Sequence, residues 1–343
     1  MQQFDRTLSD VKGFLILKLV PLTRVGMSVK TATESWEQAD HTAPYFHREN
    51  ERDGTLSPVA LLYHKDKSNN MKDNLHLSTI KEKLWGSSHQ PGQPSSSPQI
   101  LGLYNFRDVG GYELCDTKAV RRGYLFRSAN LRNVSQAGLQ TLRDHFGIRS
   151  IFELRSDENS IEGITTQHIT TINWEESRKI LLKHFNRLSH DVVESFMVIY
   201  EHYCTVSAPA YRKIFAHIRD RFNSPLLVYD DLGKDQTGVF IAVVLKLLGV
   251  SDEDIIEEYH RSEAEIEGLI PEKSARLPGL SIFDGRPPDN LEKHFLAPRE
   301  VMRAFLVYLG LTYGGGEGYL TFLGFVDVEI ELIKNNLIES KSV

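Results

Sequence analysis

One stretch of the sequence, residues 225–249, constrains the fold more than any other. It begins with an apolar run, residues 226–228, that is typical of a buried strand. Residues 239–248 are apolar on almost every side and predict a buried helix. The short loop between them contains Gly233 and Gly238. A strand, a glycine-containing loop and a helix N-terminus together predict an anion cradle, because the loop amides point inward and the helix dipole adds partial positive charge.

The loop has the sequence Asp230-Asp-Leu-Gly-Lys-Asp-Gln-Thr-Gly238. It resembles the phosphate-binding loop of the tyrosine and dual-specificity phosphatases, in the branch whose loop is His-Cys-x-x-Gly-Lys-Asp-Arg-Thr-Gly. Five residues match that pattern, namely Gly233, Lys234, Asp235, Thr237 and Gly238. The resemblance implies a phosphate-binding site lined by Gly233, Lys234, Gln236, Thr237 and Gly238.

The resemblance fails at the two positions that carry the family's chemistry. Asp230 stands where the family has its nucleophilic cysteine, and Gln236 stands where it has the arginine that clamps phosphate. The family reaction needs a thiolate of low pKa and a fixed guanidinium that stabilises the equatorial oxygens. Asp230 would repel a phosphate dianion, and Gln236 offers hydrogen bonds without charge. We therefore expect the chain to lack ordinary phosphatase turnover.

The first function that fits such a loop is that of a pseudophosphatase, a binding or regulatory protein that kept the fold. In this hypothesis the Asp230 carboxylate folds into the amide cradle as a built-in anion, and Lys234 neutralises it. No cofactor is needed. The expected partner is a phosphorylated protein or a small-molecule phosphate or diphosphate.

Two enzymatic alternatives remain open. In the first, Asp230, Asp231 and Asp235 bind Mg²⁺ on a phosphate or an isoprenyl diphosphate, because hard carboxylates suit this ion. The Asp-Asp-x-x-x-Asp spacing resembles a motif of class I terpene cyclases, although their second metal motif is not evident. In the second, Asp230 is a nucleophile that forms an aspartyl phosphate, with Asp231 or Asp235 as acid or base. The spacing differs from that of the haloacid dehalogenases, which use this mechanism.

Segments on either side of the loop extend the resemblance over about residues 100–339. Residues 105–112, Asn-Phe-Arg-Asp-Val-Gly-Gly-Tyr, resemble the entry motif of the same phosphatase branch, and residues 248–262 also resemble that branch. Members of the branch have Asp-Leu-Arg-Ser where this chain has Glu153-Leu-Arg-Ser. The carboxylate there is a candidate catalytic acid. The alternative is structural, with Glu153 and Arg155 buried where a strand meets a loop.

The resemblance implies an α/β fold of the tyrosine-phosphatase type, with a central, mostly parallel sheet flanked by helices. We assign this domain to residues 100–343. Residues 1–99 have few apolar clusters and end in a Gln/Pro/Ser tract, so we expect a mostly disordered segment and a linker. Outside the loop region, we expect strands at 122–128, 148–154 and 168–174, helices at 136–146, 191–203, 209–222 and 298–311, and an irregular excursion at 271–296.

Composition narrows the class of protein further. The net charge of -6 over 343 residues, without a basic run, disfavours nucleic-acid binding. Two cysteines, Cys115 and Cys204, provide neither a disulfide framework nor a zinc site. The sequence contains no apolar stretch long enough to span a bilayer and no clear signal peptide, so we expect a cytoplasmic protein.

Overall fold

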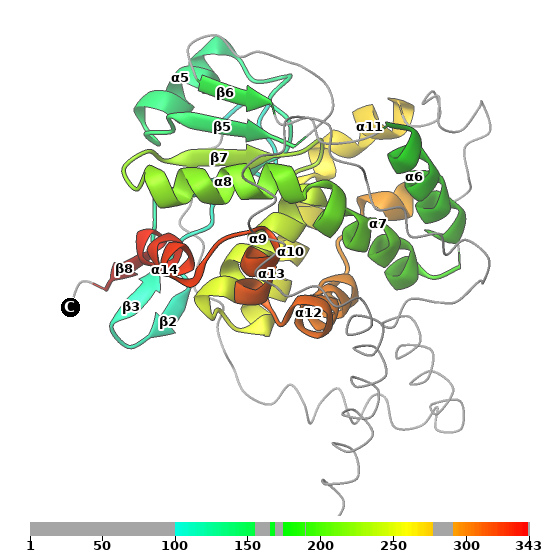
Figure 1. Ribbon diagram of the computed structural model, residues 1–343. Helices are drawn as coiled ribbons and strands as arrows, with labels where there is room; N and C mark the ends of the chain where they lie inside the picture. Colours follow the sequence, from blue (N-terminus) through cyan, green and yellow to red (C-terminus); the bar gives the residue numbers. More distant parts are fainter. Residues whose placement is uncertain (1–99, 155–164, 169–173, 189, 277–290, 342–343) are drawn as a thin grey trace, which may run out of the picture. The chain divides into compact units, whose positions relative to one another are not determined.

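The computed structural model describes residues 100–154, 165–168, 174–188, 190–276 and 291–341. Its centre is a five-stranded sheet with the strand order β1-β4-β7-β5-β6 (Figure 1). Only β1 pairs antiparallel to its neighbour, and the other strands run parallel. The predicted α/β fold with a mostly parallel central sheet is therefore confirmed. The strands are β1 Arg107–Asp108, β4 Leu125–Ser128, β5 Ser150–Glu153, β6 Thr165–His168 and β7 Leu226–Tyr229.

Strand β7 lies in the middle of the sheet, and all four of its residues are buried. Leu227 belongs to an apolar cluster on one face, together with Leu142 of helix α5 (Gln136–Asp144). Val228 belongs to the larger cluster on the other face, together with Phe240 of helix α9 (Gln236–Leu248). Neighbouring residues of a strand point to opposite faces, so covering both faces explains why this strand is a continuous apolar run.

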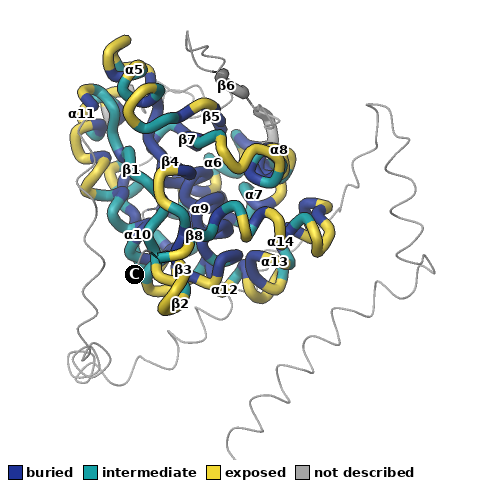
Figure 2. Tube along the Cα trace, turned by 90° about the vertical axis from the view of Figure 1, so that its left-hand side faces the viewer, coloured by how far each residue is buried: buried dark blue, intermediate teal, exposed yellow. Residues whose placement is uncertain are grey.

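Helix α9 follows the loop and is buried along its length. Every residue of α9 except Lys246 is buried, and Figure 2 shows this helix in dark blue at the centre of the molecule. Gly249 ends the helix in the left-handed conformation, with φ of 84°. The predicted buried strand, loop and buried helix of residues 225–249 are confirmed. The loop is consequently held between two rigid elements of the core.

The remaining helices pack around this centre. Figure 1 shows α7, α8, α12 and α13 on the α9 side of the sheet. A small antiparallel sheet of order β2-β3-β8 joins the end of the described chain to its beginning. The helices are α6 Trp174–Leu188, α7 Val192–Val206, α8 Ala208–Asp220, α10 Asp252–Glu265, α11 Ile270–Arg276, α12 Arg299–Tyr313, α13 Gly316–Phe322 and α14 Asp327–Asn336. The strands are β2 Glu113–Cys115, β3 Lys118–Val120 and β8 Ile338–Ser340, and two short 3-10 helices span Glu267–Leu269 and Leu291–Phe295.

The structure departs from the sequence analysis in three segments. The strand predicted at 168–174 overlaps β6 at His168, while Trp174 begins α6 and residues 169–173 lie outside the described ranges. Helix α6 was not predicted. The excursion predicted at 271–296 contains most of α11 and a 3-10 helix, and its residues 277–290 lie outside the described ranges.

Two further predictions concern residues that lie outside the described ranges. The segment 1–99, expected to be mostly disordered, lies outside the described residues, and so does Arg155. The boundary between this segment and the domain is therefore untested. Within the described ranges, no helix combines the length and the apolar character that a membrane span requires.

Candidate active-site loop

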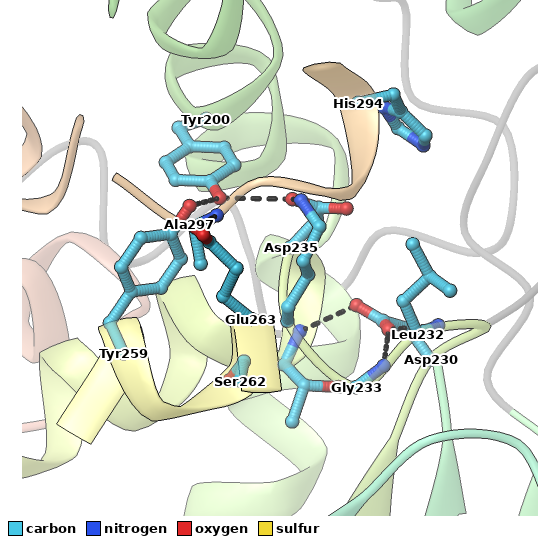
Figure 3. A network of polar contacts seen from close by, with 12 residues as sticks. Tyr200, Asp230, Leu232, Gly233, Asp235, Tyr259, Ser262, Glu263, His294 and Ala297 are labelled. Carbon is cyan, nitrogen blue, oxygen red and sulfur yellow. Dashed lines mark hydrogen bonds and ion pairs between the residues drawn. The ribbon is translucent and has the colours of Figure 1, made fainter. Parts of the chain in front are cut away.

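The side chain of Asp230 turns back into the loop that follows it. Its Oδ1 accepts hydrogen bonds from the backbone amides of Leu232, at 3.1 Å, and of Gly233, while its Oδ2 accepts one from Thr237, at 3.0 Å (Figure 3). These three N–H groups form what we call the amide cradle. Thr237 is the second residue of α9, so the carboxylate also lies at the positive end of the helix dipole. The predicted anion cradle exists, and the chain's own carboxylate fills it.

Burial dominates the electrostatics of this carboxylate. Asp230 is only 6% exposed. Burial raises its pKa, the nearby Asp235 raises it further, and the hydrogen bonds from Thr237 and Gly233 act in the opposite direction. A second anion entering this space would meet a buried carboxylate and amides that are already occupied.

Lys234 and Asp235 form a buried pair on the other side of the loop. The Lys234 ammonium lies 2.8 Å from Asp235 Oδ1 and 4.4 Å above the ring of Phe196. The hydroxyl of Tyr200 donates to the same carboxylate oxygen at 2.9 Å (Figure 3). Burial opposes ionisation of Asp235, but the Lys234 charge and these hydrogen bonds hold the pKa of Asp235 below its usual value. The expectation that Lys234 would neutralise Asp230 is therefore corrected, because its ammonium pairs with Asp235.

The other predicted phosphate-binding residues are buried at the start of α9. Gln236 is 5% exposed, and its backbone carbonyl oxygen accepts a hydrogen bond from the Tyr211 hydroxyl at 2.8 Å. Thr237 contributes its backbone amide to the cradle. A Cβ at Gly238 would lie 3.3 Å from the ring of Tyr259, so a side chain at this position would press on α10. None of these positions supplies the guanidinium that the family reaction requires.

The three loop carboxylates have different partners. Asp230 binds the amide cradle, and Asp235 binds Lys234. Asp231 lies 2.6 Å from the ammonium of Lys273, a residue of α11. Among the residues that the structure describes, no group of three His, Cys, Asp or Glu side chains is placed to hold a metal ion. The magnesium alternative stays a prediction that this arrangement does not favour, since each carboxylate already has a partner.

Glu153, the candidate catalytic acid, is the last residue of β5. It is fully buried and stands beside Tyr229 in the parallel register of β5 and β7. Its side chain is thus close to the start of the loop in the fold but closed off from solvent. This burial favours the structural interpretation over the role of an acid, which stays a prediction.

The cysteines do not replace the missing nucleophile. Cys204 lies on α7, and burial raises the pKa of its thiol far above the usual value. Cys115 lies on β2, in the small sheet. A thiolate nucleophile needs a low pKa and access to the phosphate. The thiol of Cys204 lacks the low pKa. Cys115 lies in the small sheet and not in the phosphate-binding loop.

Sequence reasoning missed the residues that support the loop from outside. The Asn105 side-chain amide donates to the carbonyl oxygens of Leu232, at 2.9 Å, and Gly233, at 3.0 Å. The fully buried Arg127 donates to the Gly233 carbonyl as well and pairs with Glu258 of α10 at 2.5 Å. One signal was available, because Asn105 opens the motif at 105–112 that resembles the phosphatase entry motif. Arg127 lies in the strand expected at 122–128, which also resembles the family, but nothing in that strand pointed to contact with the loop.

Comparison with known proteins agrees with the resemblance of the loop. A family model described as the tyrosine phosphatase family matches residues 98–339, and the chain belongs to this family. The chain is 30% identical over 134 residues to a tyrosine-protein phosphatase of Nostoc commune, which covers 38% of this chain and 45% of that relative. It is 26% identical over 190 residues to a putative tyrosine-protein phosphatase of Cupriavidus necator, which covers 52% of this chain and 68% of that relative. The chain thus spans less than half of the Nostoc protein's length.

A solved structure, the catalytic core of Siw14, is similar to 53% of this chain, and the match includes 98% of that core. The sequence identity is 18% and the TM-score is 0.28.

Proposed function

We propose that this chain is a phosphatase-family protein without cysteine-dependent hydrolysis that acts as a binding or regulatory protein, a pseudophosphatase. The observation that carries the proposal is the Asp230 carboxylate in the amide cradle. In an active member of the family, the amides of such a loop are free to receive the phosphate oxygens. Here the hydrogen bonds of the cradle are directed at a covalently attached anion, which no substrate displaces by simple exchange.

The charges around the loop support the same function. Hydrolysis requires a nucleophile that approaches phosphorus and a cation that stabilises the equatorial oxygens. The position of the nucleophile holds a buried carboxylate, and Gln236 brings no charge. Lys234, the nearby cation, is paired with Asp235. A phosphate dianion would therefore gain little attraction and would face repulsion from Asp230.

The first experiment compares hydrolysis of an aryl phosphate by the natural chain and by the Asp230→Cys/Gln236→Arg double variant. We expect no turnover by the natural chain and measurable turnover by the double variant, because the latter restores the thiolate and the guanidinium on the same loop. Asp230→Cys alone is the matched control, and it should remain near the background rate without the guanidinium.

Turnover by the natural chain would contradict the proposal and would favour Asp230 as an unusual nucleophile. A silent double variant that is folded would contradict the correspondence between this loop and the phosphatase loop. Binding of phosphate or vanadate to the natural chain, measured by calorimetry, gives a second readout. We expect none, since the cradle is filled.

A further inference from the structure

The loop has two faces that are held in different ways. On the inner face, the Gly233 amide points at Asp230. On the outer face, the Leu232 and Gly233 carbonyl oxygens accept hydrogen bonds from Asn105, and Gly233 also accepts one from Arg127. We call the side chains of Asn105 and Arg127 the outer clamp. The Leu232 carbonyl belongs to the same peptide group as the Gly233 amide of the cradle.

Peptide geometry connects the two faces. The Leu232 carbonyl and the Gly233 amide belong to one planar trans peptide, so their bonds point in opposite directions. When Asn105 holds the Leu232 carbonyl outward, the Gly233 amide has to point inward. The same relation holds for the Gly233 carbonyl and the Lys234 amide. The outer clamp therefore fixes both peptide groups of Gly233, and so the direction of its cradle amide, without contact to the anion.

The clamp is itself held rigidly. Asn105 Oδ1 accepts from the guanidinium of Arg107, which fixes the side-chain amide with its N–H groups toward the loop. Arg107 also lies 2.7 Å from Glu258, the carboxylate that pairs with Arg127 at 2.5 Å. Two guanidinium groups thus share one carboxylate of α10. The orientation of both clamp residues follows from this network, because Asn105 Nδ2 and the two terminal nitrogens of Arg127 have defined acceptors.

The backbone of the loop fits this arrangement closely. Gly233 has φ of 68°, and a Cβ there would lie 2.2 Å from the carbonyl oxygen of Ser128. Asn105 also has a positive φ, 55°, which is uncommon for a residue other than glycine. Glycine adopts such a conformation readily, whereas Asn105 accepts a less favourable one where the clamp meets the loop. Such conformations persist only where surrounding contacts determine them.

We propose that Asn105 and Arg127 are positioning residues that hold the amide cradle in its anion-binding form independently of Asp230. This inference rests on the proposed function, in which Asp230 is the resident anion. If the Asp230 carboxylate is removed, the cradle stays formed and accepts a free tetrahedral oxyanion. The natural residue at position 230, rather than the shape of the loop, then excludes phosphate.

The experiment measures binding of inorganic phosphate by calorimetry. The natural chain is compared with Asp230→Ala and with Asp230→Ser, which provides a second test if the first variant folds poorly. We expect both variants to bind phosphate and the natural chain not to bind it. Each variant's fold is checked by circular dichroism and by its thermal midpoint.

The role of the clamp is tested by adding Asn105→Gly to Asp230→Ala. Glycine accepts the positive φ of position 105 without strain, so this change removes the side-chain donor and spares the backbone. The matched control adds Asn336→Ala, because Asn336 likewise donates to two carbonyl oxygens, those of Ile218 and Arg219. Those oxygens lie at the end of α8, away from the loop.

We expect phosphate affinity to fall about tenfold with Asn105→Gly, the size expected when a charge-binding donor is misdirected, and to be unchanged with Asn336→Ala. Thermal midpoints should fall in both double variants, so stability loss alone does not explain the difference. Equal affinity in the two double variants would overturn the proposal. Folded Asp230→Ala and Asp230→Ser variants that fail to bind phosphate would overturn it too.

Failure of the proposed function gives a different result. If the natural chain binds phosphate as tightly as Asp230→Ala, then Asp230 is not the excluding anion, and the proposed function is wrong. The clamp is still judged by the comparison of Asn105→Gly with Asn336→Ala. The proposed function is therefore tested by the natural chain against Asp230→Ala. The role of the clamp is tested by the Asn105→Gly double variant against the Asn336→Ala double variant.

Discussion

The inner and outer faces of the loop differ in which residues depart from the family pattern. On the inner face, Asp230 and Gln236 replace the residues that do the family's chemistry. On the outer face, Asn105 lies in a motif that resembles the family's entry motif, and it binds the loop's carbonyl oxygens. The scaffold of an anion site and the chemistry inside it are thus carried by separate residues. A loop of this kind can lose its reaction and keep its shape.

The two faces also bury charge in different ways. Inside, Lys234 pairs with Asp235 in an arrangement of neighbours within the loop. Outside, Arg127 and Glu258 come from residues 131 positions apart in the sequence. Burial lowers the pKa of Arg127 to about 10, against the opposing effect of Glu258. The outer pair therefore connects distant elements, and its loss should lower the free energy of unfolding of the whole domain.

The largest expected effect tests the outer pair. Arg127→Met should lower the free energy of unfolding by about 3–5 kcal/mol, because it removes one partner of a buried ion pair and leaves Glu258 with Arg107 alone. Urea denaturation measures this loss. Glu258→Gln is the reciprocal variant and should lose at least as much, because it leaves the two guanidinium groups without their shared carboxylate. If Arg127→Met lowers the free energy of unfolding by less than about 1 kcal/mol, the buried pair contributes no more than an exposed surface pair. The difference between the two faces would then not be energetic.

The next effect concerns a buried histidine near the inner face. Ser195 accepts a hydrogen bond from His184 Nδ1 through its carbonyl oxygen at 3.1 Å, and burial lowers the pKa of His184 to about 4. The folded state therefore favours neutral His184, so its stabilising contribution is complete above the unfolded pKa near 6.5 and is lost as pH falls toward 4. The unfolding free energy should drop by about 3 kcal/mol between pH 7 and pH 4 from this residue.

Chemical denaturation at pH 4, 5, 6 and 7 measures this slope. The His184→Gln variant should be less stable than the natural chain at pH 7 and should show a shallower slope. His294, whose pKa burial lowers to about 3, adds to the slope in the same direction and remains in both proteins. An identical slope in the variant would assign the acid sensitivity to other groups.

The third effect is the pH dependence of stability that arises from Asp230 on the inner face. Burial and Asp235 raise the pKa of Asp230, so the folded state favours the protonated form more than the unfolded state does. The stability that this provides is complete below the unfolded value near 3.8 and is lost as pH rises through the folded value. Asp230→Asn does not titrate and should gain stability relative to the natural chain as pH rises from 4 to 7.5. If Asp230→Asn instead loses stability relative to the natural chain over this range, the hydrogen bonds of the cradle lower the pKa of Asp230 by more than burial raises it.

The smallest effect serves as a reference for both faces. Lys246, near the end of α9, lies 2.5 Å from Asp252 at the start of α10, and both side chains are substantially exposed. Lys246→Met should change the free energy of unfolding by about 0.5 kcal/mol or less, because solvent screens such pairs. The same urea series measures it. A loss approaching that of Arg127→Met would mean that burial does not distinguish these pairs.

The sequence by itself determined the strand, loop and helix of residues 225–249. The apolar run, the glycines and the buried helix follow one another locally, and each has a period or a conformation that the chain alone reveals. The place of Asp230 in the cradle also followed from the sequence, because the loop amides lie within seven residues of it. Short separation along the chain made both inferences possible.

Only the tertiary structure decided which charges pair. Lys234 had three carboxylates nearby in the sequence, and the choice of Asp235 depends on Phe196 and Tyr200 of α7, which the fold brings to the loop. The outer clamp likewise depends on Asn105 and Arg127 meeting Gly233 across more than a hundred residues. Side-chain pairing is set by distances in space, which local patterns do not encode, and so the support of the site became visible only in the fold.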